Sequence, residues 1–345
     1  MIKWFWSMKK PNAVLIWDTY KLTNFSSARF FEIKSNLEHQ KIVKKDIYFG
    51  QKIVDNIRNE IRKNISSDPG YPDRISKKVY DTEKSVISKI NKLTDKYFKK
   101  CSDKELCSIF SKCYKQVSIM EIPMSYRGNV QLSDILTETI KQELAKKLRA
   151  QGKLKLLDEY FLALSTPKRE SYMSLGQKMV LELAVLKIKN DPSFDKELRE
   201  HTKNFAWMGC VMFEGMPLTQ EDFLKDINSK IEQNPEILLN KMEDSRKDSE
   251  TKIKTIVTSL EFSKETLKTL EQLREWYHLR TYAKDCISKA IAKTMPVLLE
   301  IAARKNMTYD DLSFLQAREI ENIFKISKEA LQNRIEERKK GWAAV

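Results

Sequence analysis

Apolar positions recur with helical spacing along most of the chain. From about residue 35 onward, Ile53, Val54, Ile57 and Ile61 fall on one face of a helix, because side chains three or four residues apart share a face. The segment 68–72 reads Asp-Pro-Gly-Tyr-Pro and interrupts this pattern. A second stripe follows it, at Ile75, Val79, Val86, Ile90, Leu93 and Tyr97. The pattern therefore predicts two long helices that are separated by a turn.

Further helices are predicted along the rest of the chain. Ser102 and Glu105 form a capping-box pattern that opens a third helix, and Thr219 and Asp222 do the same for a later one. Pro235 occupies a first helical position, whereas Pro296 predicts a kink or break inside a long helix. The other predicted helical ranges are 132–149, 155–164, 174–189, 194–213, 264–305 and 328–340. Together these elements predict an elongated, all-α multi-helix bundle.

Residues 1–34 do not share the helical pattern. This segment is rich in aromatic residues, and its run 13–17, Ala-Val-Leu-Ile-Trp, fits a short strand or a buried extended segment. We expect an irregular N-terminal arm whose aromatic side chains pack onto the helical body. Stacking on nucleic-acid bases is the alternative use of such side chains.

The composition supports the helical prediction. Glycine and proline contribute 8 and 9 of the 345 residues, which is about 5% against an ordinary usage of roughly 12%. A β-sandwich or barrel needs a turn every ~8–12 residues, so it needs more of these residues than the chain has. The chain also lacks the glycine-rich loop that opens a nucleotide-binding α/β fold.

The net charge of +15 is unevenly distributed. Residues 1–130 hold 26 basic and 14 acidic residues, and residues 131–345 hold 37 and 34. We predict one helical domain over 1–345 with a soft boundary near 121–130. The basic part, 1–120, fits either lysine-rich solvated helix faces or a surface for an anionic partner.

Cysteine spacing and hydropathy indicate where in the cell the protein is located. The five cysteines include no C-x-x-C pair, and Cys101, Cys107 and Cys113 are six residues apart, so neighbours point to opposite sides of a helix. We expect small apolar core residues in a reducing environment and no metal site. No apolar run reaches the ~18 residues of a membrane span. A cytoplasmic location is the simplest expectation.

Two clusters of residues are candidate ligand-binding sites. In the first, His201 and Asn204 share a helix face with Trp207 beside them, which could offer hydrogen bonds and a stacking surface to a ligand. An ordinary half-buried helix is the alternative. In the second cluster, Arg280 and Lys284 are four residues apart, so the two cations face the same way. Either a ligand phosphate or an acidic side chain of another helix would explain this pair.

These clusters lie in segments that resemble a known family. Residues 200–207, Glu-His-Thr-Lys-Asn-Phe-Ala-Trp, and 213–224, Phe-Glu-Gly-Met-Pro-Leu-Thr-Gln-Glu-Asp-Phe-Leu, resemble the central helical region of phosphoenolpyruvate synthase-like proteins, of which rifampicin phosphotransferase is a relative. The likeness continues at 274–280, Arg-Glu-Trp-Tyr-His-Leu-Arg, at 298–304, Leu-Leu-Glu-Ile-Ala-Ala-Arg, and at 308–320. Segment 68–106 is also similar to these proteins.

The resemblance implies phosphoryl transfer by three parts. In that family an ATP-grasp module supplies the phosphoryl group, a mobile domain carries it on a histidine, and a further region holds the acceptor. This chain departs from the pattern because it has no ATP-grasp segment, and none of His39, His201 and His278 follows the glycine-rich turn of a phosphohistidine. We therefore expect the central helical part alone, from a split or truncated gene product.

The expected function is that of an acceptor-binding or scaffold region of such a phosphotransferase, catalytically incomplete by itself. Residues 131–345 would hold a small-molecule acceptor, while a partner chain supplies ATP and phosphohistidine, and this chain binds no cofactor of its own. The expected substrate-binding residues are His201, Asn204, Trp207, Trp276, Tyr277, Arg280 and Lys284. The alternatives are a helical protein-interaction module without a small-molecule site, or a basic nucleic-acid-binding helical protein. A membrane partner is not expected.

Overall fold

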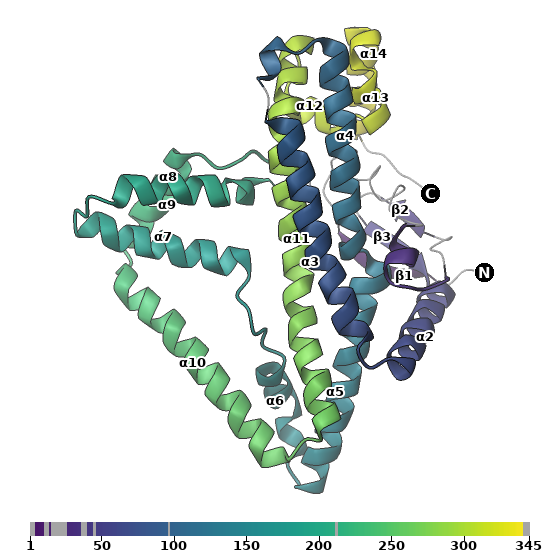
Figure 1. Cartoon of the computed structure of the whole chain (residues 1–345), viewed down its shortest axis with the longest axis vertical. Helices are drawn as coiled ribbons and strands as arrows, with labels where there is room; N and C mark the ends of the chain where they lie inside the picture. The colour runs from purple at the N-terminus through teal and green to yellow at the C-terminus, as the bar shows by residue number, and fades with distance from the viewer. Residues whose placement is uncertain are drawn as a thin grey trace. The chain divides into compact units, whose positions relative to one another are not determined.

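Helices dominate the structure, which confirms the predicted all-α multi-helix bundle (Figure 1). It is a computed structural model that describes residues 4–9, 14, 26–35, 40–43, 46–95, 97–210 and 213–340. Most of the run 13–17, together with His39, lies outside the described residues. Of the N-terminal arm, residues 26–30 form a helical turn.

A small antiparallel sheet precedes the helices. Strand β1 (Trp4–Lys9) pairs with β3 (Asp46–Gly50), and β3 pairs with β2 (Gln40–Val43). The prediction of a helical pattern from residue 35 is therefore wrong for 40–50. Segment 42–49 contains Ile42, Val43, Ile47, Tyr48 and Phe49, and such β-branched and aromatic residues favour strands over helices. The predicted helical pattern holds from Gln51.

The chain forms two compact units. Unit 1 contains residues 1–131, 209–217 and 283–345, and unit 2 contains 132–208 and 218–282. The chain thus enters unit 2 after Gln131, next to the boundary expected near 121–130, and its last sixty or so residues return to unit 1. A single division into 1–120 and 131–345 does not describe this path.

Unit 1 is built around paired long helices. Its α3 and α4 lie side by side (Figure 1), and the predicted stripes of Ile57 and Ile61 and of Ile75 and Ile90 are fully buried. The Ser102–Glu105 capping box forms as predicted. The helices of this unit are α2 (Gln51–Ser67), α3 (Tyr71–Thr94), α4 (Asp103–Glu121), α12 (Tyr309–Ser313), α13 (Ala317–Glu321) and α14 (Lys328–Lys340).

Unit 2 is built around α7, which packs against α8, α9 and α10. The capping box at Thr219 and the first-turn proline of α10 form as predicted. The predicted helix 194–213 is too long, because α8 ends at Phe205, where Trp207 Nε1 donates to the Asn204 carbonyl at 2.7 Å. The helices are α5 (Gln131–Ala150), α6 (Leu157–Leu164), α7 (Tyr172–Ile188), α8 (Phe194–Phe205), α9 (Gln220–Ile231) and α10 (Pro235–Leu260).

The longest helix, α11 (Lys264–Lys305), supplies residues to both units. It continues through Pro296, so of the kink or break predicted there, the break is absent. Within the described residues, no helix is both long and apolar enough to cross a membrane.

Candidate functional site

His201, the polar residue expected to contact a ligand, belongs to the core of unit 2. Its ring is fully buried, stacks on Phe205 at 4.9 Å between ring centroids, and meets the edge of Phe223 at 4.5 Å. Neither ring nitrogen has a hydrogen-bond partner in the part of the chain that the structure describes. Burial lowers the pKa of His201 to about 4, because an apolar environment disfavours the charged imidazole. This histidine is therefore neutral and closed to ligands.

The neighbours of His201 divide between surface and core. The side chain of Asn204 is exposed, whereas Trp207 is buried with its ring edge-on to Tyr172 at 6.0 Å. The indole nitrogen of Trp207 is occupied by the end of α8, as described above. The three residues thus do not form one accessible face.

The second predicted cluster is equally divided. Trp276 is fully buried, and the hydroxyl of Tyr277 shares a hydrogen bond of 2.9 Å with Thr137 Oγ1. Arg280 is exposed and lies 3.6 Å from the Asp134 carboxylate, so an acidic side chain within the protein accounts for this cation. Lys284, one turn later on α11, is exposed and belongs to unit 1.

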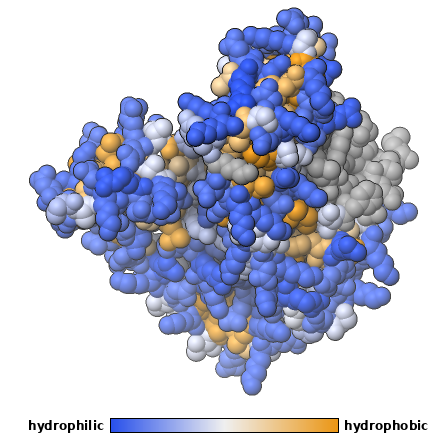
Figure 2. Space-filling model, turned by 45° about the horizontal axis from the view of Figure 1, so that its top comes forward, coloured by the Kyte–Doolittle hydropathy of each residue, from blue (hydrophilic) through white to orange (hydrophobic). Residues whose placement is uncertain are grey.

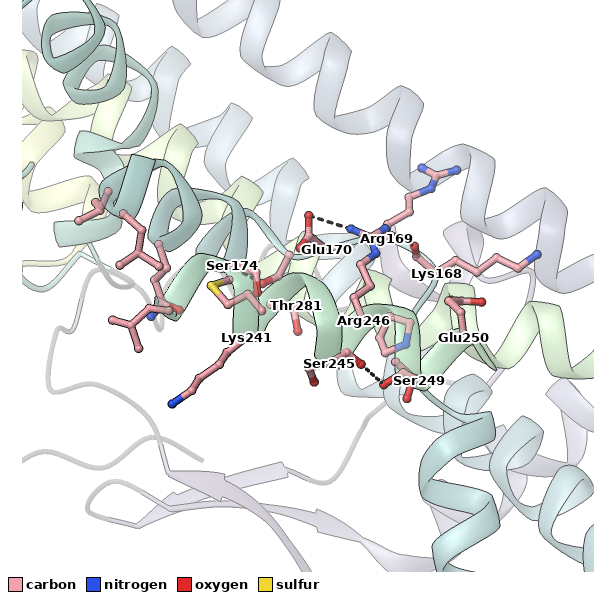
Figure 3. A pocket seen from close by; sticks show the side chains of 18 of the residues that line it. Lys168, Arg169, Glu170, Ser174, Lys241, Ser245, Arg246, Ser249, Glu250 and Thr281 are labelled. Atoms are coloured by element: carbon pink, nitrogen blue, oxygen red, sulfur yellow. Dashed lines mark hydrogen bonds and ion pairs between the residues drawn. The ribbon is translucent and has the colours of Figure 1, made fainter. Parts of the chain in front are cut away.

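A cleft of about 900 Å³ lies elsewhere in unit 2 (Figure 3). It is bordered by the loop 166–171, by α7, α9 and α10, and by Thr281 of α11. None of the seven predicted residues lines it. Its lining residues are Thr166, Pro167, Lys168, Arg169, Glu170, Ser171, Ser174, Gln177, Val180, Leu181, Asp226, Lys230, Gln233, Leu238, Lys241, Met242, Ser245, Arg246, Ser249, Glu250 and Thr281.

A buried arginine fixes one end of this cleft. Arg274 of α11 donates from Nε to the Thr166 carbonyl at 2.6 Å and from Nη2 to Glu250 at 2.7 Å. Its side chain is only 7% exposed. Breaking such charge-assisted bonds of a buried group costs about 1.5–3 kcal/mol. Arg274 therefore holds the start of the loop against α10.

A second arginine, Arg246 of α10, contacts the same loop, but its side chain is much more exposed than that of Arg274. Arg246 Nη1 lies 3.0 Å from the Glu170 carboxylate, and its Nη2 donates to the Lys168 carbonyl at 3.4 Å (Figure 3). The two side chains are 54% and 28% exposed. An ion pair in such a position contributes about 0.2–1 kcal/mol. The Arg246–Glu170 contact is therefore weaker than the one that Arg274 makes.

The remaining charges of the loop point outward. Lys168 lies 3.0 Å from Glu271, and Arg169 lies 3.9 Å from Glu275, one turn further along α11. Figure 3 shows both basic side chains extending away from Ser174 and Ser245. These two pairs fasten the outer side of the loop, and they leave the inner side to hydroxyl groups and Arg246.

The lining of the cleft is rich in charged and hydroxyl-bearing side chains. Five basic and three acidic residues line the cleft, together with the hydroxyl-bearing Thr166, Ser171, Ser174, Ser245, Ser249 and Thr281. Its lining includes no histidine or cysteine, the residues that most often transfer protons or act as nucleophiles near neutral pH. Within the described residues there is also no cluster of three or more His, Cys, Asp or Glu side chains that could hold a metal ion.

Sequence reasoning missed the residues that form this cleft. The loop 166–171 reads Thr-Pro-Lys-Arg-Glu-Ser, and Ser171 caps α7 by accepting from the Ser174 amide at 3.1 Å. The proline and the N-cap serine between two helices are the sequence signal for this loop and for the start of the next helix. Arg274 belongs to the segment of the second predicted cluster, but the prediction rests on the four-residue spacing of Arg280 and Lys284 and does not include it.

Comparison of the chain with protein-family models, with curated proteins and with solved structures finds no match.

Proposed function

We propose that unit 2 is the acceptor-binding region of a phosphoenolpyruvate synthase-like phosphotransferase and that the cleft holds the acceptor. A partner chain with an ATP-grasp module and a phosphohistidine domain would supply the phosphoryl group. The chain itself would position the acceptor, which is the main contribution of a protein to phosphoryl transfer. It would be catalytically incomplete alone, and we place it in the cytoplasm, in keeping with its five free cysteines.

The observation that carries this proposal is the cleft, together with the loop at its end that Arg274 holds in place. Its volume of about 900 Å³ is within the ~300–1,000 Å³ of ordinary ligand sites. Arg274, which holds the loop, comes from segment 274–280, one of the segments that resemble the family. Segment 274–280 therefore both resembles the family and supplies the arginine that holds the loop of the cleft.

The environments of two histidines support the view that the chain does not carry the phosphoryl group. His201 and His278 are buried, and burial is the main cause that lowers the pKa of each. A histidine that receives a phosphoryl group from a partner must reach the surface. We therefore expect no ATP turnover by the isolated chain, and measurable ATP hydrolysis that copurifies with it through repeated steps would contradict the proposal.

Calorimetric titration of the full chain with phosphoenolpyruvate, as a small phosphorylated probe, tests the cleft directly. The expected result is saturable binding to one site, lost in Ser245→Trp because the new ring fills the cleft. Ser88→Trp is the matched control, since Ser88 is exposed on α3 and lies outside the cleft. Absence of binding by the natural chain, or equal binding by both variants, would overturn the proposal.

The alternative of a helical protein-interaction module rests on exposed apolar side chains. Leu162 on α6 is 74% exposed, and Figure 2 shows several separate hydrophobic groups within a mainly hydrophilic face. Separate groups of this kind are common on the surfaces of monomeric proteins. If no small molecule binds in the cleft, an interaction role becomes the preferred hypothesis.

A further inference from the structure

Two arginines hold the loop 166–171 with different strength: Arg274 through the Thr166 carbonyl, and Arg246 through the Glu170 carboxylate and the Lys168 carbonyl. Arg274 is buried, and both its carbonyl bond and its Glu250 bond are short. Arg246 is half exposed, and its second bond, to the Lys168 carbonyl, is 3.4 Å long. A ligand that enters the cleft meets Arg246 and not Arg274, because Arg274 does not line the cleft.

Basic residues outnumber acidic residues five to three in the lining of the cleft, which favours a negative ligand group. Ser174 and Ser245 also line the cleft and offer hydroxyl donors to a ligand (Figure 3). Helix α7 begins at the cleft with no acidic residue in its first turn, and Glu170 directly precedes its N-cap Ser171, at the positive end of the helix dipole. Lys241 of α10 adds a cation at the edge. Glu170 is the carboxylate that now satisfies Arg246.

We propose that the cleft takes an anionic ligand, with a phosphate or carboxylate group, which replaces Glu170 on the guanidinium of Arg246. This inference rests on the proposed acceptor-binding function and specifies its ligand class. In the free protein Glu170 occupies Arg246, and in the complex an oxyanion forms the two-pronged contact that a guanidinium makes with phosphate or carboxylate. Arg274 keeps the loop start in place during the exchange.

Binding of inorganic phosphate to the full chain, measured by calorimetry at low salt, tests the exchange. Glu170→Gln removes the competing carboxylate, so the affinity for phosphate should rise about two- to fivefold, the worth of an exposed ion pair. Arg246→Ala removes the anion contact, so the affinity should fall about tenfold or more.

Glu271→Gln is the matched control. It removes one negative charge from the same loop's ion pairs, but Glu271 holds Lys168 on the outer side and does not line the cleft. We expect its affinity for phosphate to stay within about twofold of the natural chain's, since its effect is limited to an exposed pair. Thermal unfolding followed by circular dichroism would show that all variants remain folded.

The outcomes separate the two proposals. Phosphate binding that rises no more in Glu170→Gln than in Glu271→Gln, or that persists unchanged in Arg246→Ala, overturns the exchange. Binding of phosphoenolpyruvate at the cleft without any phosphate affinity also overturns it, but leaves the acceptor-binding function standing. Failure of the natural chain to bind either probe overturns both.

Discussion

Two regions of unit 2 differ in whether their side chains leave space for a ligand. Around His201, α8 and α9 bring aromatic rings together and leave no room for a ligand. Around Arg246, the loop 166–171 and α10 bring charges and hydroxyls together and leave a cleft. The closed region contains His201, which the sequence predicts as a ligand contact. Ring and imidazole side chains thus fill the core around His201, whereas the side chains around Arg246 are held by ion pairs and leave room for the ligand that we propose.

The largest expected effect comes from opening the closed region. Phe223→Ala removes a buried ring that packs against His201, and such a truncation costs about 3–5 kcal/mol of unfolding free energy. Denaturant unfolding of the full chain measures the loss. Leu162→Ala, at a side chain that is 74% exposed, should stay within about 0.5 kcal/mol. Equal effects of the two variants would show that the region around His201 is not core.

The next effect concerns the fixed end of the cleft. Arg274→Ala breaks the bonds to Thr166 and Glu250 and should lower the unfolding free energy by about 2 kcal/mol. It should also weaken phosphoenolpyruvate binding, because the loop loses its anchor. Lys252 is on the same helix as Glu250 and forms an exposed ion pair with Glu159 of α6. Lys252→Ala should cost about 0–1 kcal/mol and leave binding unchanged. A stable Arg274→Ala variant with full binding would contradict the role given to Arg274.

A pH effect of similar size should arise from His201. The pKa of this histidine is lowered to about 4 in the folded chain, against about 6.5 when unfolded. Below pH 6.5 the unfolded chain therefore binds a proton that the folded chain does not, and stability falls as the pH drops toward 4. This one group should remove about 2 kcal/mol between pH 7 and pH 5.

His201→Leu isolates that contribution. The variant should lose less stability than the natural chain between pH 7 and pH 5, with the difference measured by denaturant unfolding at each pH. Asn204→Leu, at an exposed neighbour on α8, should leave the pH dependence unchanged. Identical pH profiles for the natural chain and His201→Leu would mean that the imidazole reaches water.

The smallest effect is expected from Arg280 and Lys284, the two cations that the sequence predicts as ligand contacts. Replacing both Arg280 and Lys284 by alanine should cost less than about 1 kcal/mol, because both are exposed and Arg280 pairs with Asp134 at the surface. Phosphoenolpyruvate affinity, measured by calorimetry, should not change. A large loss of affinity would return the site to this face of α11.

The fold was more predictable than the site for physical reasons. Helical stripes such as Ile57 and Ile61 and the capping boxes at Ser102 and Thr219 are local patterns, and each has the predicted structure. The strands were missed because the pairing of 4–9 with 46–50 joins segments far apart in the sequence. The return of residues 283–345 to unit 1 is likewise a long-range property.

The cleft depends on such long-range contacts throughout. Arg274 is 108 residues from Thr166, and Arg246 is 78 residues from Lys168. No spacing rule along one helix brings these residues together. Residues His201 and Trp276 carried the typical features of ligand contacts, but the sequence did not reveal that their rings are buried. Burial, more than residue type, distinguishes the two regions.

A crystal structure of the full chain soaked with phosphoenolpyruvate would test the central claim most directly. The account predicts density between the loop 166–171 and α10, with a ligand oxyanion on Arg246 and Glu170 turned away. Density beside Trp207 or Tyr277, or an empty cleft at saturating ligand, would contradict it.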